Sequence, residues 1–212
     1  MKQNAVIYLH GKGGSAQEAE HYRPLFADCE VIGFDYASQT PWEARAEFPA
    51  FFDALCRQYE SVSLIANSIG AFFAMSALYD RPIRAAWFIS PIVDMEKLIG
   101  TMMQWAGVSE EALRAAGTIE TAFGETLSWE YLSYVREHPL HWSIPTEILY
   151  GARDELTPRE TVSAFARRTG AGLTVMEGGE HWFHTAEQMA FLDRWLGEMR
   201  DALLRKNAEI RS

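Results

Sequence analysis

The chain has 212 residues, of which 48% are apolar and 23% charged, proportions that exclude a disordered or fibrous protein. Its formal charge of −10 argues against a protein that binds nucleic acid, because neutralising phosphates needs a basic surface. No apolar run reaches the length of a membrane span, no signal peptide precedes the first strand pattern, and the two cysteines are far apart, so we expect a cytoplasmic protein.

Short apolar runs alternate along the chain with segments of helical spacing. The runs that predict strands are residues 5–9, 31–36, 62–66, 85–90, 146–150 and 173–176. Several of these runs are apolar on both faces, which is typical of a parallel sheet covered by helices on each side. The alternation predicts one α/β domain over residues 1–212, built on a doubly wound, mainly parallel six-stranded sheet.

The predicted helices have well-marked beginnings. The capping-box pattern, a hydroxyl residue followed three positions later by Glu or Gln, begins at Ser15, Thr40, Thr157 and Thr185. Pro24 and Pro49 fall inside two of the helical patterns. We expect these two helices to be broken or short, because proline removes a helical hydrogen bond and clashes with the preceding turn.

Residues 91–143 depart from the alternation because they contain no clear strand. Their apolar residues have helical spacing instead, with helices expected from Met95, after Ser109 and after Ser128. An insertion of this length between two strands of a compact domain is usually functional. We expect a helical cap, or lid, at the active-site edge of the sheet, and the alternative is a segment that only covers one edge.

The strongest local signal is the segment of residues 62–73, VSLIANSIGAFF, in which an apolar strand turns into an apolar helix at Ser68. This is the context of a nucleophile elbow, whose small neighbours let strand and helix pass closely. Ala66 and Gly70 meet that need, although glycine is usual at the first position. The N–H of Ile69 then points at a developing oxyanion. The alternative is that Ser68 only caps the helix that follows.

A glycine-rich loop from His10 to Ser15 follows the first predicted strand. Glycines let backbone N–H groups approach a ligand closely, and we expect the Lys12 N–H to be the second oxyanion donor. The loop matches neither of the glycine patterns of phosphate-binding loops. Its simplest alternative is a tight turn without a ligand.

Two further polar residues follow the last two predicted strands. Asp154 lies after the strand at 146–150, and His181 follows the strand at 173–176 across a glycine turn. Parallel strands bring their carboxyl ends to one edge of the sheet, where α/β proteins bind ligands, so we expect both residues to lie near Ser68. Taken singly, Asp154 also fits the pattern of an acidic residue in a solvated loop. His184 is an alternative to His181 as the base.

Over nearly all of its length the chain resembles the α/β-hydrolase family. The matching motifs are HGKGGS, ANSIGA, YGARDELTP and GGEHWF. The resemblance implies a nucleophile at Ser68, a base at His181 and an acid at Asp154, on a sheet without the family's first two strands and with a cap at residues 91–143. Because some members place the acid after the fourth of these strands, Asp94 is the fallback. The chemistry of such a site needs no metal and no cofactor.

The expected substrate is a small molecule with an apolar acyl group. The insertion supplies a set of aromatic and methionine side chains: Met102, Met103, Trp105, Trp129, Tyr131, Tyr134 and Trp142. We expect at least half of this set in the core that joins the insertion to the sheet. The residues expected in the substrate pocket are His10, Met102, Trp105, Trp129 and Trp182.

The expected reaction is hydrolysis of a small to medium carboxylic ester or thioester through an acyl-enzyme. The same machinery serves amide hydrolases and C–C bond hydrolases. From a different class, the alternative is a non-catalytic binding protein that keeps the pocket. The sequence indicates no oligomeric state.

Overall fold

The computed structural model describes residues 3–210, with side chains described through Arg200 and at Ala202. The sheet and the helices that cover it are β1 Asn4–Leu9, η1 Ala16–Phe26, β2 Glu30–Gly33, α1 Pro41–Gln58, β3 Ser61–Asn67, α2 Ile69–Ala77, β4 Ile83–Ile89, β7 Thr146–Gly151, α6 Arg159–Thr169, β8 Gly172–Met176 and α7 Ala186–Ile210. The segment between β4 and β7 contains α3 Met95–Ala106, α4 Glu110–Ala116, β5 Thr118–Glu120, β6 Thr126–Ser128 and α5 Trp129–Glu137.

The six long strands form one sheet in the order β2-β1-β3-β4-β7-β8, and every neighbouring pair is parallel. The predicted sheet is therefore confirmed. The chain runs outward from β1 to β2, crosses back to β3 and continues in the other direction, so the strand order reverses between β1 and β3. In doubly wound sheets, ligands bind at such a reversal, outside the carboxyl ends of the strands.

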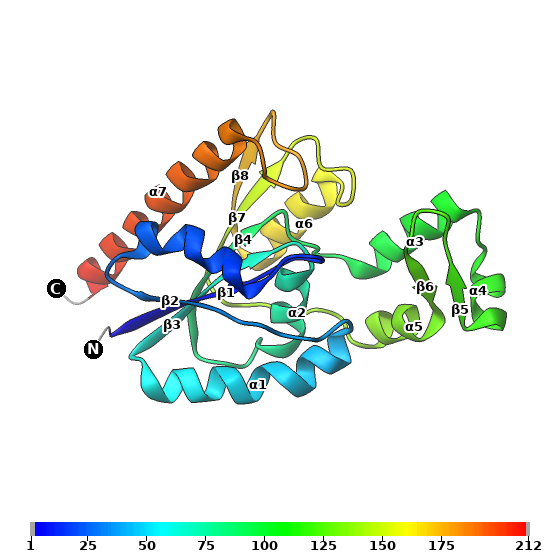
Figure 1. Ribbon diagram of the computed structural model, residues 1–212, viewed down its shortest axis with the longest axis horizontal. Coiled ribbons are helices and arrows are strands. Elements are labelled where there is room, and N and C mark those ends of the chain that lie inside the picture. The colour runs from blue at the N-terminus through cyan, green and yellow to red at the C-terminus, as the bar shows by residue number, and fades with distance from the viewer. Residues whose placement is uncertain (1–2, 211–212) are drawn as a thin grey trace.

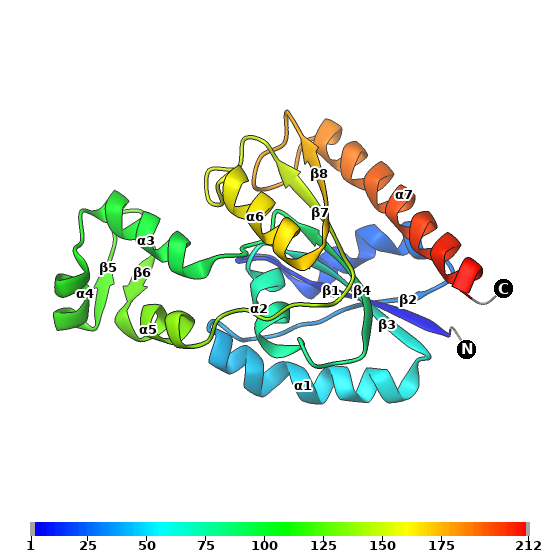
Figure 2. The ribbon, with the colours of Figure 1, turned by 180° about the vertical axis from the view of Figure 1, so that it is seen from behind.

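Side chains along the strands alternate between two cores. On β1, Ala5, Ile7 and Leu9 face the core shared with α1, α2 and α6, whereas Val6 and Tyr8 face the core shared with η1 and α7. Figures 1 and 2 show these two groups of helices on opposite faces of the sheet. This double burial is the physical reason for the strand sequences that are apolar on both faces.

Helix α1 continues through Pro49, so the expectation of a broken or short helix is wrong at this position. Phe48 and Phe52, on either side of the proline, are fully buried. Burying a phenylalanine side chain is worth about 1.5–3 kcal/mol, so the two together offset the roughly 3 kcal/mol that proline costs inside a helix. Pro24 lies in η1, which is a 3₁₀ helix and not an α-helix.

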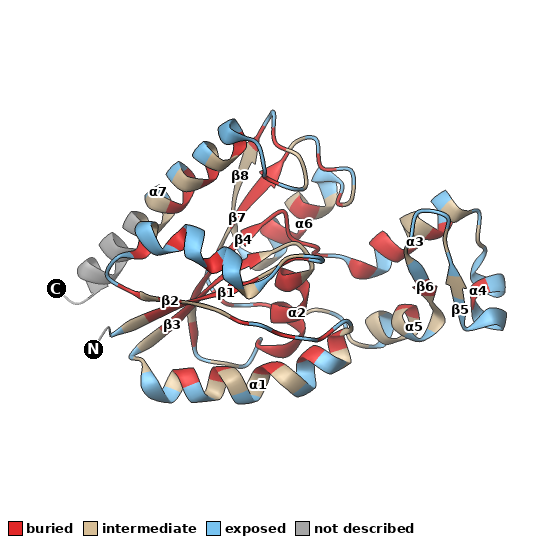
Figure 3. Cartoon of the chain, in the orientation of Figure 1, coloured by how far each residue is buried: buried red, intermediate tan, exposed pale blue. Residues whose placement is uncertain are grey.

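The insertion extends past the carboxyl ends of the strands (Figure 1), and much of its outer side is exposed (Figure 3). Its three expected helices are present and are capped by the side chains of Asp94, Ser109 and Ser128. The expectation of no strand in this segment is wrong, because β5 and β6 pair as a short antiparallel hairpin. Strands of three residues are too short for an alternating pattern to stand out.

The longest helix, α7, packs one apolar stripe on the sheet through Leu192, Trp195 and Leu196. Its other faces carry charged residues. Among residues 3–210, no helix combines the length and the apolar character that crossing a membrane requires.

The loops that follow β7 and β8 touch through their main chains at two glycines. A Cβ atom on Gly151 would lie 2.5 Å from the carbonyl oxygen of Glu180 and 2.6 Å from the carbonyl carbon of Gly179. The N–H of Arg153 donates to the Gly179 carbonyl oxygen at 2.8 Å. This contact fixes the position of one loop relative to the other.

We expect Gly151→Ala to lower the free energy of unfolding by about 1–3 kcal/mol, because the added methyl group must push the two loops apart. Gly178→Ala is the matched control, since a Cβ there meets nothing within 4 Å. Urea denaturation of both variants measures the difference. Equal stability of the two variants would contradict the contact.

Candidate active site

Ser68 stands in a strained turn between β3 and α2. Its φ is 52° and its ψ −118°, a conformation that non-glycine residues rarely adopt. Its N–H donates to the carbonyl oxygen of Ile89 at 3.0 Å, and its carbonyl oxygen accepts from the N–H groups of Ala71 and Ile92 at 3.2 Å. Its side chain makes no capping hydrogen bond to α2, so the helix-cap alternative is wrong. The main chain therefore holds Ser68 while its hydroxyl is left for another partner.

Gly70 lets the first turn of α2 lie directly against the end of β1. A Cβ at this position would be 2.4 Å from the carbonyl oxygen of His10 and 2.9 Å from that of Leu9. Only glycine fits such a close approach. The approach brings the loop that follows β1 to the side of Ser68.

The hydroxyl of Ser68 meets His181, and His181 meets Asp154. The distance from Ser68 Oγ to His181 Nε2 is 2.8 Å, and that from His181 Nδ1 to Asp154 Oδ2 is 2.7 Å. Because a carboxylate only accepts hydrogen bonds, Nδ1 of His181 carries a proton and donates a hydrogen bond to Asp154. In this tautomer of the ring, Nε2 carries no proton and is free to accept a hydrogen bond from the Ser68 hydroxyl. The three residues thus form one directed chain of hydrogen bonds.

The carboxylate of Asp154 is fully buried and held by further donors. Its Oδ1 accepts from the N–H of Leu156 at 2.8 Å and from the N–H of Thr157 at 3.0 Å. Such donors replace the hydrogen bonds to water that a carboxylate loses on burial. These bonds also fix the plane of the carboxylate that orients the ring of His181.

The two alternative residues lie elsewhere. His184 Nδ1 donates to the carbonyl oxygen of Trp182 at 2.8 Å, and its ring stacks on Trp182. Asp94 Oδ1 accepts from the N–H of Lys97 at 2.9 Å and caps α3. In the described part of the chain, neither residue is hydrogen-bonded to Ser68 or His181.

The loop after β1 is held rigidly beside Ser68. The hydroxyl of Tyr36 donates to the carbonyl oxygen of His10 at 2.6 Å, and the two rings stack with centroids 4.2 Å apart. Burial raises the pKa of Tyr36, so this hydroxyl stays protonated. Lys12 and Ile69 line the same cavity as Ser68, and among residues 3–210 neither backbone N–H has a hydrogen-bond acceptor. Both groups are free to bind an anionic oxygen.

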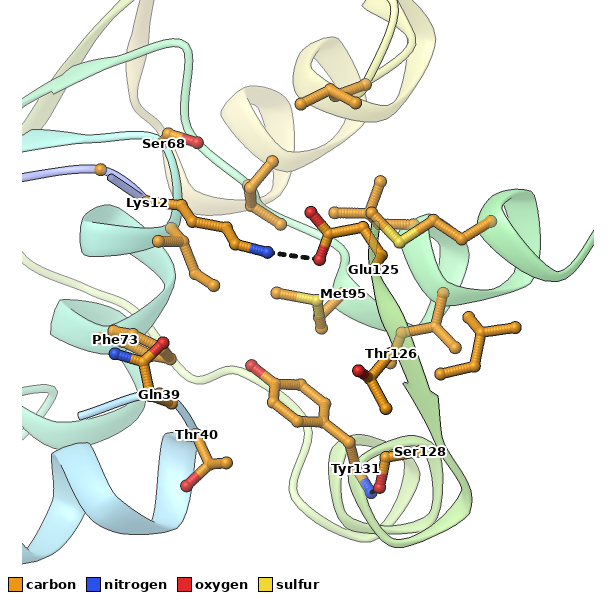
Figure 4. A pocket seen from close by; sticks show the side chains of 18 of the residues that line it. Lys12, Gln39, Thr40, Ser68, Phe73, Met95, Glu125, Thr126, Ser128 and Tyr131 are labelled. Carbon is orange, nitrogen blue, oxygen red and sulfur yellow. Dashed lines mark hydrogen bonds and ion pairs between the residues drawn. The ribbon is translucent and has the colours of Figure 1, made fainter. Parts of the chain in front are cut away.

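A cavity of about 770 Å³ opens in front of Ser68, between the sheet and the insertion. Figure 4 shows that both the sheet side and the insertion contribute side chains to the wall of this cavity. Across the cavity, the ammonium of Lys12 forms an ion pair with the carboxylate of Glu125. Many of the apolar residues in the wall come from α2, α3 and the loops that follow β4 and β7: Phe73, Ile92, Met95, Leu98, Ile99, Met102 and Leu156. The cavity suits a ligand with a mostly apolar body.

Three of the five residues expected in the pocket line this cavity, namely His10, Met102 and Trp105. Trp129 does not line it, because its ring packs against the core with the Arg114 guanidinium 5.5 Å away. Trp182 does not line it either, and is 68% exposed.

Sequence reasoning missed two groups of cavity residues. One is the segment after β2, including Gln39 and Trp42, and the other is the tip of the β5–β6 hairpin, including Phe123 and Glu125. The first group could have been found, because β2 neighbours β1 and its carboxyl end lies at the same edge. The second group had no signal, because the hairpin itself was not expected.

Among the residues described, no cluster of three or more His, Cys, Asp or Glu side chains is suited to hold a metal ion. The site itself holds a hydrogen-bonded serine, an imidazole that can take its proton, and two free N–H groups. Such a set activates a hydroxyl for attack on a carbonyl carbon.

No protein-family model matches the sequence, and no curated protein matches it. Est1E from Butyrivibrio proteoclasticus is similar in structure, with 18% sequence identity and a TM-score of 0.77 over 96% of this chain and 89% of that chain. Mouse alpha/beta hydrolase domain-containing protein 10 is similar with 17% identity and a TM-score of 0.72 over 94% of this chain and 90% of that chain. The Pyrococcus furiosus esterase Pf2001 is similar with 20% identity and a TM-score of 0.61 over 96% of this chain and 82% of that chain. Est1E is also known with ferulic acid bound. The chain thus has the α/β-hydrolase fold, as its four motifs predicted.

We expect Asp154→Asn to slow the labelling of Ser68 by a fluorophosphonate about 10³- to 10⁴-fold, because an amide no longer selects the productive tautomer of His181. Mass spectrometry of the labelled peptide gives the rate. Asp94→Asn is the matched control and should label at the wild-type rate, since asparagine caps a helix as well as aspartate does. Equal slowing in both variants would rule out Asp154 as the orienting acid.

Proposed function

We propose that the protein is a serine hydrolase that cleaves a carboxylic ester or thioester through an acyl-enzyme on Ser68. The observation that carries this proposal is the directed chain of hydrogen bonds from Ser68 through His181 to Asp154, at the mouth of a large, mainly apolar cavity. The esterases among the similar structures support an ester as the bond that is cleaved. Est1E with ferulic acid bound supports an acyl group as large as an arylpropenoyl group.

In the proposed reaction, Nε2 of His181 takes the proton of Ser68 as the serine oxygen attacks the carbonyl carbon. Asp154 stabilises the imidazolium that forms. The imidazolium then protonates the leaving oxygen or sulfur, and the acyl group remains on Ser68. A water molecule, deprotonated by the same ring, attacks the acyl-enzyme and releases the carboxylic acid.

The negative charge that develops on the carbonyl oxygen would be stabilised by the backbone N–H groups of Lys12 and Ile69. Both groups are free in the described residues and lie on the cavity beside Ser68. The Ile69 N–H is also at the positive end of the α2 dipole. Preorganised donors of this kind need no rearrangement as charge develops.

We also propose that residues 91–143 act as a cap that shapes the acyl site. Helix α3, the hairpin tip and α5 all contribute to the cavity wall, opposite the loops that carry Lys12 and Ser68. In this division of roles the sheet supplies the reacting groups and the insertion selects the substrate.

Ser68→Ala should lower ester hydrolysis by about 10⁴-fold or more, because it removes the attacking oxygen and leaves only binding and the oxyanion donors. The measurement is a panel of 4-nitrophenyl esters and acyl thioesters with acyl chains of two to twelve carbons. His184→Ala is the control for an unrelated histidine and should keep near-wild-type activity. Retained turnover in a correctly folded Ser68→Ala protein would overturn the proposal.

Lys12→Ala should change kcat by no more than about fivefold, because the variant keeps the backbone N–H and loses only an exposed ion pair with Glu125. Loss of an oxyanion donor, in contrast, lowers kcat by about 10²- to 10³-fold. Measurement of kcat for the best ester of the panel distinguishes the small loss expected for the side chain from the large loss expected for an oxyanion donor. A hundredfold loss would show that the ammonium itself takes part in the reaction.

A further inference from the structure

Tyr131 of α5 lies in the wall of the cavity, and its buried hydroxyl has no hydrogen-bond partner among the described residues. The residue is held in place, because its N–H donates to the Ser128 hydroxyl at 3.2 Å and its ring packs on that of Trp42 with centroids 5.6 Å apart. In Figure 4 the hydroxyl points into the cavity. Buried polar groups of folded proteins nearly always have a partner, so this hydroxyl is suited to a ligand.

The other polar side chains that Figure 4 shows around this part of the wall are already in use. Gln39, Thr40 and Ser128 each make a hydrogen bond within their own loop or helix start, and Thr126 donates to the Glu120 carboxylate across the β5–β6 hairpin. Tyr131 differs from these four neighbours because its oxygen makes none. A ligand atom beside these residues therefore finds the Tyr131 hydroxyl free of any competing hydrogen bond among the described residues.

The charges around the cavity favour a neutral ligand group at this point. The Lys12 ammonium is paired with Glu125, and Glu130, a second carboxylate, also lines the cavity. Among the described residues that line the cavity, a negative substituent would meet no cation other than the paired Lys12. Burial raises the pKa of Tyr131, so its hydroxyl stays protonated and can both donate and accept.

We propose that Tyr131 is a specificity-determining residue that hydrogen-bonds a neutral hydroxyl or ether oxygen on the acyl group, remote from the carbonyl that Ser68 attacks. The substrate class is then an ester or thioester of an oxygen-substituted acid with an otherwise apolar body. This proposal rests on the proposed hydrolysis at Ser68. A site built to bond such an oxygen disfavours the analogue without it, because the buried hydroxyl is then left unpaired.

The acyl group, rather than the leaving group, is the part held at Tyr131. The acyl group stays bound through both chemical steps, whereas the alcohol or thiol departs after the first. The Tyr131 oxygen is buried, while the rim of the cavity is formed by Trp105 and Phe123, which are 52% and 44% exposed. The buried end suits the group that remains, and the exposed rim suits the group that leaves.

The test compares two matched pairs of 4-nitrophenyl esters with wild type and Tyr131→Phe. The pairs are 3-(4-hydroxyphenyl)propanoate with 3-phenylpropanoate, and 6-hydroxyhexanoate with hexanoate, which carry the hydroxyl at different distances from the carbonyl. Wild type should prefer the hydroxylated member of at least one pair. Tyr131→Phe should lower kcat/KM for that member by about three- to tenfold and leave its partner unchanged, so that the preference disappears.

Tyr134→Phe is the matched control, because Tyr134 is on the same helix and packs on His138 and Trp42 but does not itself line the cavity. It should keep the wild-type preference. If Tyr131→Phe discriminates within both pairs as wild type does, or weakens both members of a pair equally, the role of Tyr131 is overturned while hydrolysis at Ser68 stands.

Failure of the proposed function gives a different result, in which wild type turns over no ester of either pair, or Ser68→Ala turns them over equally well. In that case calorimetric binding of the four free acids to wild type and Tyr131→Phe still tests Tyr131. Tighter binding of a hydroxy acid that Tyr131→Phe abolishes supports its role, and equal binding overturns it.

Discussion

The backbone of Ser68 is the constraint on which the rest of the site depends. A non-glycine residue in such a conformation costs about 1–3 kcal/mol and persists only where its surroundings hold it. Here the Ile89 carbonyl oxygen and the Ile92 N–H hold both sides of the Ser68 peptide unit. Typical hydrogen bonds contribute about 0.5–1.5 kcal/mol each, so these bonds, together with burial of the adjoining strand and helix, are enough to offset the strain.

The same edge of the sheet transmits this constraint to the other site residues. Ser90, the residue after β4, also has a positive φ, of 44°, and its N–H donates to the carbonyl oxygen of Leu149 on β7. On the far side of β7, the N–H of Arg153 bonds to the loop that carries His181, at Gly179. A row of main-chain bonds thus runs from the Ser68 turn across β4 and β7 to the His181 loop. The geometry between Ser68 and His181 is set by the sheet rather than by mobile side chains.

This dependence on the sheet explains which features could be predicted from the sequence. Ser68, Asp154 and His181 each follow a strand with a strong apolar pattern, and parallel strands must end at one edge, so their proximity followed from local patterns alone. Ala66 in place of the usual glycine did not mislead, because the requirement is for a small side chain. The course of α1 through Pro49 could not be predicted, because it depends on burial of Phe48 and Phe52 in tertiary contacts that no local pattern contains.

The cavity wall was harder to predict because aromatic side chains serve core and pocket alike. Trp129 and Tyr131 are two positions apart on α5, a separation of about 200° around a helix, so they must face different directions. Both side chains pack against the core, but only Tyr131 also lines the cavity, and this difference is set by how the insertion sits over the sheet. Because α5 has no part in the row of sheet hydrogen bonds that holds the Ser68 turn, its cavity-facing residues can change without disturbing the Ser68–His181 geometry. Under the proposed function, substrate preference and reaction chemistry are therefore separable in this fold.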